Sequence, residues 1–337
     1  MPALNAAGLA DMILGYRRAK ILFTAAYLDI FSCLDRPQTA GSLARRLKLD
    51  LRAAEIFLDA LAAMGCLEKN GSRSYRNAPV SSRFLVRRSP EYLGHNLKYQ
   101  EILWDAWGEL RRCLEKGGAI RPLRHWLTRH DGFVEEYIRG MSDIARRPAE
   151  EVATIVDASD ARDLIDVGAG PGVYSLAFLR RNPRLNATLL DLPETLRITR
   201  GILGRRADVR GRLRLKSGDY LKDSLGSNCC DIVLLSHITH DESAQSNRLL
   251  IDKSYRALRP GGRVVIHDFM LEPSRTSPEF GALFAVHMLT YTSGGRTYTA
   301  QEYARWLREA GFKRLSRHAI CAGAPNASYA MLGYKDC

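Results

Sequence analysis

The chain has 337 residues, of which 46% are hydrophobic, and a formal net charge of +13. This length allows a sizeable core and is enough for two domains. The basic residues are scattered in pairs, such as Arg45-Arg46 and Arg205-Arg206, and are not gathered in one tail. A scattered excess of this kind indicates a solvated basic surface and does not by itself define a nucleic-acid or membrane partner.

The seven cysteines include no Cys-x-x-Cys pair. Their odd number and irregular spacing argue against a disulfide framework or a zinc site, so we expect no metal. The first residues, MPALNAAGLADM, lack the basic stretch and apolar core of a secretory signal. No apolar run approaches the ~18 residues that span a bilayer. We therefore expect a cytoplasmic protein without membrane insertion.

Apolar residues at helical spacing predict helices over residues 7–35. The segment from Ile21 to Phe31 is apolar on more than one side, which indicates burial against a partner as well as in its own core. Thr39 and Asp50 are expected to be the N-caps of the next two helices.

The first of these helices should end at Leu47 and the second at Ala63. The following GCLEKNGSRSYRN alternates around Asn-Gly and predicts a hairpin. Two helices followed by a hairpin are typical of a winged helix.

Winged helices commonly bind DNA through their second helix. Here that helix, LRAAEIFLDALAAM, offers Arg52, Glu55 and Asp59 as its polar face. The acids would repel phosphates, and Asn, Gln and Lys for reading bases are missing. We therefore favour a scaffold or dimerisation role without nucleic acid. A DNA-binding regulator with a nucleotide-sensing domain remains the alternative from another class.

Residues 99–150 are expected to form a mostly helical linker that contributes to a substrate pocket, with tryptophans at positions 104, 107 and 126. Strands then alternate with helices, which predicts an α/β fold with a doubly wound, mostly parallel, Rossmann-like sheet. The expected strands lie near 163–167, 187–191, 213–216, 231–236 and 262–268. The expected domains are residues 1–98, the linker 99–150, and 151–337.

Three glycines, Gly168, Gly170 and Gly172, follow the first of these strands in "LIDVGAGPG". Glycines there permit a tight turn and close backbone approach to a ligand at a helix N-terminus. A dinucleotide fold usually reads G-x-G-x-x-G, with the third glycine one residue later. The glycines are compatible with a nucleotide-like ligand or with an ordinary strand-to-helix turn, and their spacing disfavours a nicotinamide-dependent oxidoreductase.

Two carboxylates follow the next strands. Asp191 in ATLLDLP could accept both ribose hydroxyls, or could cap the helix that begins before Pro193. Asp219 in KSGDY could accept the amino group of adenine. Because each follows a strand end, the glycines and both acids should converge on one crevice.

Two further stretches complete the pattern. ALRPGGRVVIHDFML indicates a helix, a Pro-Gly-Gly turn and a strand ending at Asp268, and CDIVLLSHITHDES a strand leading to His237 and His240. Here the chain resembles the S-adenosylmethionine-dependent O-methyltransferases of the caffeic acid and hydroxyneurosporene type. LIDVGAGPG, LLDLP, SGDY, SHITHDE, LRPGG and GGRTYTAQEYARWLREAGF match that family in order and spacing over nearly the whole chain.

The resemblance implies a methyltransferase fold and a homodimer formed through the N-terminal domain. It also implies methyl transfer to a hydroxyl of an aromatic or polyene small molecule, a secondary metabolite or pigment. C- or N-methylation, or another use of the same cofactor, remains the alternative within this fold.

The resemblance also implies the roles of individual residues. The expected cofactor-binding residues are Asp166, Gly168, Gly170, Gly172, Asp191, Leu192, Gly218, Asp219, Tyr220 and Ser236. The expected acceptor-binding residues are Tyr137, Met141, His237, His287, Met288 and Tyr291. His240 is the expected general base, supported by Asp241 and Asp268.

A histidine suits this chemistry. Methyl transfer is an in-line displacement on a sulfonium carbon, so the protein supplies alignment and a deprotonated nucleophile. A phenol has a pKa of ~10 and is mostly protonated at neutral pH, whereas an imidazole with a pKa of ~6.5 can take its proton as the bond forms. Asp241 or Asp268 could fix the imidazole's tautomer.

The sequence departs from the family pattern around this histidine. GGRTYT places Thr297 where many relatives have a second carboxylate, and Asp268 is one methylene shorter than the usual Glu. We therefore expect His240 to be less tightly held. Glu242 also replaces the tryptophan that often follows the His-Asp pair.

Overall fold

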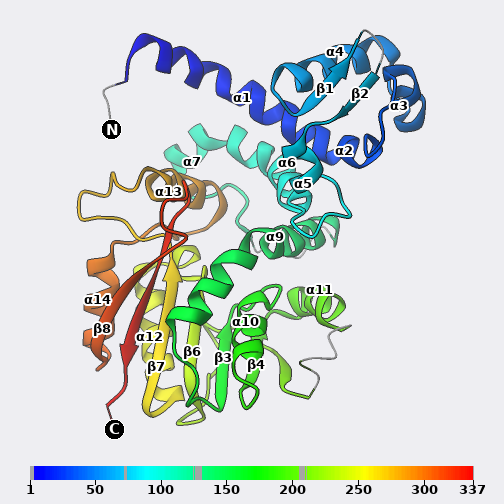
Figure 1. Ribbon diagram of the computed structural model, residues 1–337. Helices are drawn as coiled ribbons and strands as arrows, with labels where there is room; N and C mark the ends of the chain where they lie inside the picture. The colour runs from blue at the N-terminus through cyan, green and yellow to red at the C-terminus, as the bar shows by residue number, and fades with distance from the viewer. Residues whose placement is uncertain are drawn as a thin grey trace. The chain divides into compact units, whose positions relative to one another are not determined.

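The computed structural model describes residues 4–71, 74–123, 125, 131–204, 209 and 211–336. Its contacts divide the chain into two compact units, Met1–Trp104 and Asp105–Cys337. Figure 1 labels most of the helices and strands of both units. Along the described chain, none of the helices combines the length and apolar character that a membrane crossing requires.

The first unit is helical with one hairpin. Its helices and strands are α1 (Ala6–Tyr27), α2 (Ile30–Cys33), α3 (Ala40–Leu47), α4 (Leu51–Ala63), β1 (Leu67–Asn70), β2 (Ser74–Asn77), α5 (Pro79–Phe84) and most of α6 (Gly94–Gly108). Both expected N-caps are present, because Thr39 Oγ1 accepts from the Ser42 N–H at 3.1 Å and Asp50 Oδ1 from the Ala53 N–H at 2.8 Å. The predicted helix, helix, hairpin order is confirmed.

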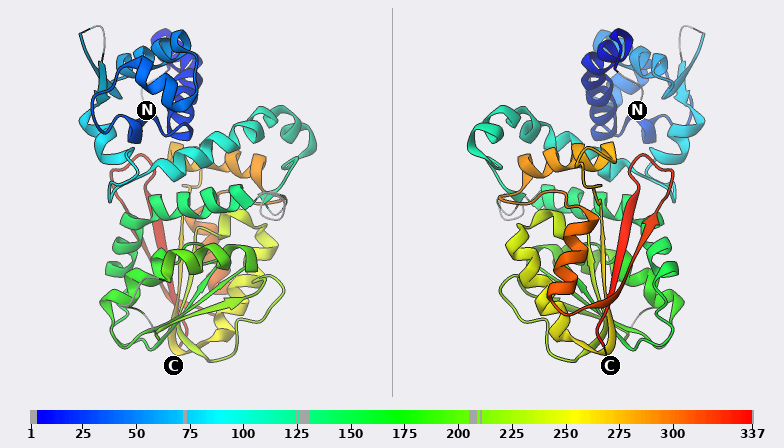
Figure 2. Two further views of the ribbon diagram at one scale, coloured as in Figure 1. Left: turned by 90° about the vertical axis from the view of Figure 1, so that its right-hand side faces the viewer. Right: turned by 90° about the vertical axis from the view of Figure 1, so that its left-hand side faces the viewer.

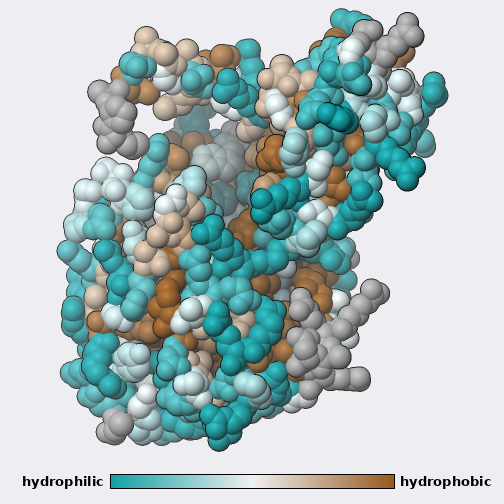
Figure 3. Space-filling view, viewed as in Figure 1, coloured by the Kyte–Doolittle hydropathy of each residue, from teal (hydrophilic) through white to brown (hydrophobic). Residues whose placement is uncertain are grey.

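Part of the segment 21–31, which was expected to be buried against a partner as well as in its own core, belongs to the hydrophobic core of this unit. Ile30 and Phe31 are each only 1% exposed and belong to the unit's own core. Large exposed apolar side chains lie instead near the start of α1, where Figure 3 shows tan and brown residues. The prediction that residues 21–31 are buried in the unit's own core is therefore confirmed at the C-terminal end of the segment, and burial of this segment against a partner stays a prediction.

The second unit contains the sheet. Its elements are α7 (Leu110–Lys116), α9 (Asp131–Ile155), β3 (Asp163–Val167), α10 (Val173–Arg181), β4 (Asn186–Asp191), α11 (Pro193–Leu203), β5 (Leu213–Ser217), β6 (Cys230–Ser236), the 3₁₀ turn η2 (Thr239–Asp241), α12 (Ala244–Ala257), β7 (Leu258–Asp268), α13 (Glu279–Tyr291), α14 (Ala300–Glu309), β8 (Lys313–Ile320) and β9 (Ser328–Tyr334). Helices lie on both faces of the sheet in the views of Figure 2.

The seven strands have the order β5-β4-β3-β6-β7-β9-β8. The first five are parallel, whereas β9 pairs antiparallel with both β7 and β8. The chain winds outward in one direction from β3 and in the other from β6, so the switch point lies between these strands, where a doubly wound sheet binds its ligand. The predicted mostly parallel sheet is confirmed. The antiparallel pair β8 and β9 was not anticipated.

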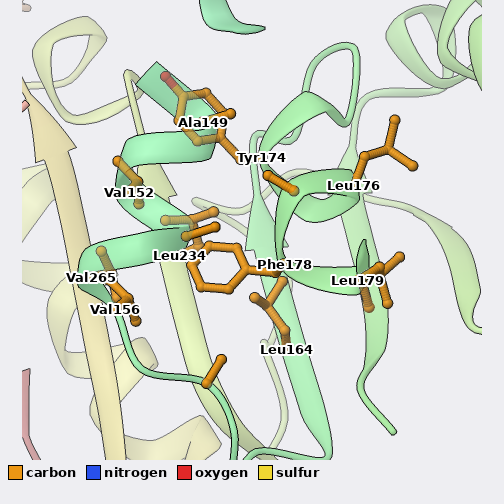
Figure 4. Packing of buried hydrophobic residues seen from close by; sticks show 14 of the residues in the cluster. Ala149, Val152, Val156, Leu164, Tyr174, Leu176, Phe178, Leu179, Leu234 and Val265 are labelled. Atoms are coloured by element: carbon orange, nitrogen blue, oxygen red, sulfur yellow. The ribbon is translucent and has the colours of Figure 1, made fainter. Parts of the chain in front are cut away.

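Each face of the sheet carries its own apolar core. Val265 of β7 packs in the cluster formed with α9 and α10, shown in Figure 4, whereas its neighbours Val264 and Ile266 pack in the cluster beneath α12 and α14. This alternation is the two-residue period of a strand. The two covered faces hold the strands rigidly and leave their carboxyl ends to build a site.

Two local predictions differ from the structure. Pro260-Gly261-Gly262 is not a simple turn before a strand, because β7 begins at Leu258, paired with Cys230, and its next partner pair is Arg263 with Ile232. The intervening residues bulge, and the Gly261 N–H donates to the Lys335 carbonyl at 3.0 Å. Pro148, expected near the opening of a new unit, lies inside α9.

Candidate active site

The glycine turn after β3 has the geometry that a close ligand requires. Gly168, Gly170 and Gly172 all have positive φ, at 65°, 52° and 75°. A Cβ on Gly168 would lie 2.5 Å from Ile238 Cγ2, and one on Gly172 would lie 2.7 Å from Leu189 Cδ2. A Cβ on Gly170 would meet no atom of the described residues within 4 Å. Packing therefore explains two glycines, and Gly170 leaves open space beside the turn.

Asp191, at the end of β4, is tied to this turn. Its Oδ2 accepts from the Gly170 N–H at 2.8 Å, and its Oδ1 accepts from the Leu192 N–H at 2.7 Å. Burial raises the pKa of Asp191 even though these hydrogen bonds oppose the shift. The carboxylate thus joins the residues that follow β3 and β4, and the crevice expected there stays a prediction.

Two other predicted cofactor residues have side chains engaged within the fold. Asp166 on β3 is buried and accepts from Ser175 Oγ at 2.7 Å, and burial raises its pKa to about 7. Ser236, at the end of β6, lies 3.0 Å from Nδ1 of His267. Burial also holds the pKa of His267 well below its usual range, so this ring is neutral.

The loop after β5 follows the carboxyl end of the strand that pairs with β4. The Gly218 N–H donates to the Asp191 carbonyl at 3.0 Å. Oδ1 of Asp219 accepts from the Leu221 N–H at 3.0 Å, and its Oδ2 lies 3.4 Å from Lys222 Nζ. The Tyr220 hydroxyl donates to Glu242 Oε1 at 2.9 Å, which joins this loop to the segment that carries His240.

His240 lies on η2 and is held by a buried carboxylate. Its Nδ1 is 2.7 Å from Oδ1 of Asp268, which is fully buried at the end of β7. Asp268 also accepts from the Thr239 hydroxyl and from the Phe269 N–H. A carboxylate partner places the proton on Nδ1 of a neutral ring, so Nε2 is the acceptor nitrogen.

Charges set the protonation of this pair. Burial disfavours the imidazolium, but the charges of Asp268 and Asp241 and the hydrogen bond to Asp268 outweigh burial and raise the pKa of His240 to about 9. Burial raises the pKa of Asp241 to about 6, and its Oδ1 lies 3.7 Å from His240 Nε2. Burial also opposes ionisation of Asp268, but His240 and His237 hold its pKa well below the usual range.

His237 borders the same carboxylate. Its Nδ1 is 3.6 Å from Asp268 Oδ1, and its ring centroid is 5.8 Å from that of His240. Ligand atoms of these three residues lie within 4.8 Å of one another. A metal ion there would have to break the hydrogen bond between His240 and Asp268, so the cluster is better suited to holding a base.

An aromatic surface on α13 extends from His240. The ring of Phe284 meets His240 edge-on at 4.8 Å, and the next ring along α13 is His287 at 5.5 Å from Phe284. His287 stacks on Trp107 at 5.9 Å and on Tyr291 at 5.3 Å. Burial lowers the pKa of His287 to about 4, so its ring is neutral.

The remaining predicted acceptor residues lie on two different helices and differ in burial. Met288 is buried on α13, and Tyr137 and Met141 are half-buried on α9, where Tyr137 stacks on Phe133 at 6.0 Å. Trp126 lies outside the described residues. Sequence reasoning missed Phe280 and Phe284. Their signal was present, because positions 280, 284, 287 and 291 follow one helical face.

Thr297 occupies the place where a second carboxylate was expected. It is buried, and its Oγ1 has no hydrogen-bond partner among the residues that the structure describes. The neighbouring Gly295 packs against η2 so closely that a Cβ there would lie 2.2 Å from the His240 carbonyl oxygen. Asp268 and Asp241 are thus the acids that flank His240.

The doubly wound sheet, the glycine turn tied to a carboxylate, and the histidine–carboxylate pair are together compatible with a nucleotide-dependent group-transfer enzyme. Comparison with known families makes the class specific. An O-methyltransferase domain matches residues 120–313, and an O-methyltransferase dimerisation domain matches residues 10–87. The chain belongs to the family of S-adenosylmethionine-dependent O-methyltransferases.

Individual relatives agree with this assignment. The chain is 30% identical to the tetracenomycin polyketide synthesis 8-O-methyl transferase TcmO of Streptomyces glaucescens, over 93% of each chain. It is 30% identical to a 3-hydroxy-5-methyl-1-naphthoate 3-O-methyltransferase of Streptomyces sahachiroi, over 97% of this chain and 94% of the relative. It is also 31% identical to the N,N-dimethyltransferase OxyT of Streptomyces rimosus, over 93% of this chain and 92% of the relative.

Among solved structures, that of PigF with SAH has a TM-score of 0.87 and 26% identity, covering 98% of this chain and 100% of that one. The protein is an S-adenosylmethionine-dependent methyltransferase. The residues at the strand ends fit such a donor, since the open side of Gly170 lies beside the carboxylate of Asp191.

Proposed function

We propose that the enzyme methylates a hydroxyl group on a flat aromatic small molecule, with His240 as general base. The observation that carries this proposal is the hydrogen bond between His240 and the buried Asp268, at the end of a surface of aromatic rings. Stacked rings favour a planar acceptor, because aromatic groups pack face to face or edge to face at such distances. The names of TcmO and the naphthoate 3-O-methyltransferase support oxygen as the methylated atom.

Each side chain has a defined task in this reaction. When bound, S-adenosylmethionine supplies an electrophilic methyl carbon on a sulfonium. His240 Nε2 would take the proton of the acceptor hydroxyl and so make the hydroxyl oxygen the nucleophile for that methyl carbon. Asp268 keeps the ring oriented and stabilises the imidazolium that results. The rings of α13 and Trp107 hold the acceptor plane and exclude water.

We further propose that the donor lies beside the glycine turn and the carboxylate of Asp191, with its adenosyl end toward Tyr220. The hydrogen bonds that tie Asp191 to Gly170 and Gly218 to Asp191 support one continuous crevice at these strand ends. The proposal also includes a homodimer formed by the N-terminal unit, which the matched dimerisation domain supports.

The test separates binding from chemistry. His240→Ala should lower turnover of a hydroxynaphthoate acceptor by roughly 10²–10⁴ while leaving the affinity for S-adenosylhomocysteine unchanged. Turnover is measured with a methyl-labelled donor and mass spectrometry, and affinity by calorimetry. His318→Ala, on β8, is the matched control and should behave like the wild type. Wild-type turnover in His240→Ala, or label on nitrogen or carbon of the acceptor, would contradict the proposal.

A further inference from the structure

The carboxylate of Asp268 accepts hydrogen bonds on both of its oxygens. Oδ1 accepts from Nδ1 of His240 at 2.7 Å and from the Phe269 N–H at 2.8 Å. The other oxygen, Oδ2, accepts from the Thr239 hydroxyl and from the His240 N–H at 3.1 Å. The hydroxyl of Tyr303, on α14, lies 3.5 Å from Oδ2. The oxygen that does not contact the imidazole ring thus has donors of its own.

The hydrogen bond between Tyr303 and Thr239 has a defined direction. Their hydroxyl oxygens are 2.7 Å apart. Threonine has one hydroxyl hydrogen and an ionised carboxylate can only accept, so Thr239 donates to Asp268 and its oxygen accepts from Tyr303. Burial and the charge of Asp268 raise the pKa of Tyr303 well above its usual value, so the phenol keeps the proton that it donates.

Both hydroxyls are held by contacts that do not involve the carboxylate. Thr239, Tyr303 and Asp268 are fully buried. The Thr239 carbonyl accepts from Asn247 Nδ2 at 2.8 Å, which fixes the turn η2 against α12. The ring of Tyr303 packs edge-on against Trp306 at 5.6 Å. Loss of either hydroxyl should therefore leave the surrounding packing in place and remove only a donor.

Other titratable groups surround His240 and Asp268 from several elements. They are Tyr174 on α10, His237 after β6, Asp241 on η2, Glu242 after η2, His267 on β7 and His287 on α13. Within the described part of the chain, none of their side chains forms a hydrogen bond with Oδ2. The side chains that reach this oxygen are those of Thr239 and Tyr303.

Donors on Oδ2 affect how firmly His240 and Asp268 together keep a proton. When His240 is neutral, the pair carries the negative charge of the carboxylate, whereas the protonated pair is neutral overall. Hydrogen bonds to a carboxylate favour its charged form, so the two hydroxyls stabilise the deprotonated pair more. His240 must be in this neutral form to take the proton of an acceptor hydroxyl.

We propose that Thr239 and Tyr303 are positioning residues that act on His240 through Asp268, by donating hydrogen bonds to the carboxylate oxygen that the imidazole does not use. This inference rests on the proposed role of His240 as general base. It assigns a task to a phenol that lies 64 positions after Thr239 and reaches the base only in the fold.

The test removes one hydroxyl at a time and measures kcat/KM for the hydroxynaphthoate acceptor against pH. Tyr303→Phe and Thr239→Val should each move the rising limb to higher pH by about 0.5–1 pH unit, because the carboxylate loses a donor. At pH 7.5 this shift lowers kcat/KM by about three- to tenfold, and the loss should shrink as pH rises. A uniform loss with an unmoved limb would show a merely structural role and overturn the proposal.

Two control variants make the shift specific. Thr239→Ser keeps the hydroxyl and should restore the wild-type limb. Tyr298→Phe removes another fully buried phenol hydroxyl, which donates to the Glu242 carbonyl at 2.6 Å and not to Asp268. It should leave the limb where it is in the wild type. An equal shift in Tyr298→Phe would contradict an effect through Asp268.

A measurement without acceptor separates this inference from the proposed base. The ring of His240, labelled with ¹⁵N, is titrated by NMR in the full-length protein, with His240→Ala to assign its signals. In Tyr303→Phe its titration should move to higher pH. If it moved while the kcat/KM limb did not, the inference would hold and His240 would not be the base. An unmoved titration would overturn the inference, whatever the turnover of His240→Ala.

Discussion

His240 lies between two carboxylates that differ in burial and in distance from the ring. Asp268 contacts Nδ1 at 2.7 Å and is fully buried, whereas Asp241 lies 3.7 Å from Nε2. Together they raise the pKa of His240 to about 9 against the effect of burial. Below that pH the free enzyme holds an imidazolium, which cannot take a proton, so the active base form is gained as pH rises.

The pH profile tests this reading. The value of kcat/KM should rise with pH, reach half of its maximum near pH 9 and level off above it, because this ratio reports ionisations of the free enzyme. Asp241→Asn removes one of the charges that stabilise the imidazolium, so the rising limb should move to lower pH by about 1 unit. Asp268→Asn should instead abolish most activity at every pH, because the ring loses its orienting partner. An unmoved limb in Asp241→Asn would show that its charge does not act on His240.

At the strand ends, the sequence allowed a prediction of individual site residues where they belong to one short motif. The glycine turn and Asp191 were predicted from the residues that follow each apolar run, and His240 from the family resemblance; their roles stay predictions. The aromatic surface was harder to foresee, because Trp107 and His287 are 180 positions apart and meet only in the fold. The engagement of the Asp219 carboxylate in its own turn depends on loop geometry, which composition does not determine.

At the scale of elements, the segment after α13 packs against the backbone of η2, the turn that carries His240. Gly295 lies against η2, where a Cβ would meet the His240 carbonyl oxygen at 2.2 Å and the Asp241 carbonyl carbon at 2.7 Å. These are backbone atoms, which cannot move aside as a side chain does. Gly294 differs, because a Cβ there would meet only the Ser243 Cβ, at an ordinary 3.7 Å.

Gly295→Ala should therefore displace η2 and reduce both stability and turnover. Overpacking of this kind costs about 1–3 kcal/mol, and thermal unfolding measures it. Gly294→Ala is the adjacent control and should leave the melting temperature within about a degree or raise it slightly, since alanine restricts the unfolded chain. Equal effects of the two substitutions would show that contact with η2 is not the reason for glycine at position 295.

Elements were predicted best where the signal is local. The caps Thr39 and Asp50 and the first five strands of the sheet follow from short windows of sequence. The bulge at Pro260-Gly261-Gly262 depends on a bond from Gly261 to Lys335, which lies at the opposite end of the domain's sequence. The turn propensity of Pro260-Gly261-Gly262 contains no information about a hydrogen bond to Lys335. A turn was therefore predicted where the structure has the first part of β7.

At the scale of the whole molecule, α1 carries an apolar stripe that its own unit leaves exposed. Leu9, Met12, Ile13 and Tyr16 are 49%, 65%, 62% and 55% exposed. Their spacing of three and four residues places them on one face of the helix. An exposed apolar stripe on a matched dimerisation domain is suited to a symmetric interface, in which the same face of each protomer contributes.

Replacing Met12 and Ile13 together by Glu should convert the expected dimer into monomers. Symmetry places four new charges in one interface, and an unpaired charge is costly to bury, so the dimer dissociation constant should rise by roughly two orders of magnitude or more. Light scattering coupled to size exclusion should then give 37.7 kDa in place of twice that mass. Leu249→Glu, at an exposed apolar position on α12, should leave the dimer intact. A Met12→Glu, Ile13→Glu protein that kept the wild-type mass at low micromolar concentration would place the interface elsewhere.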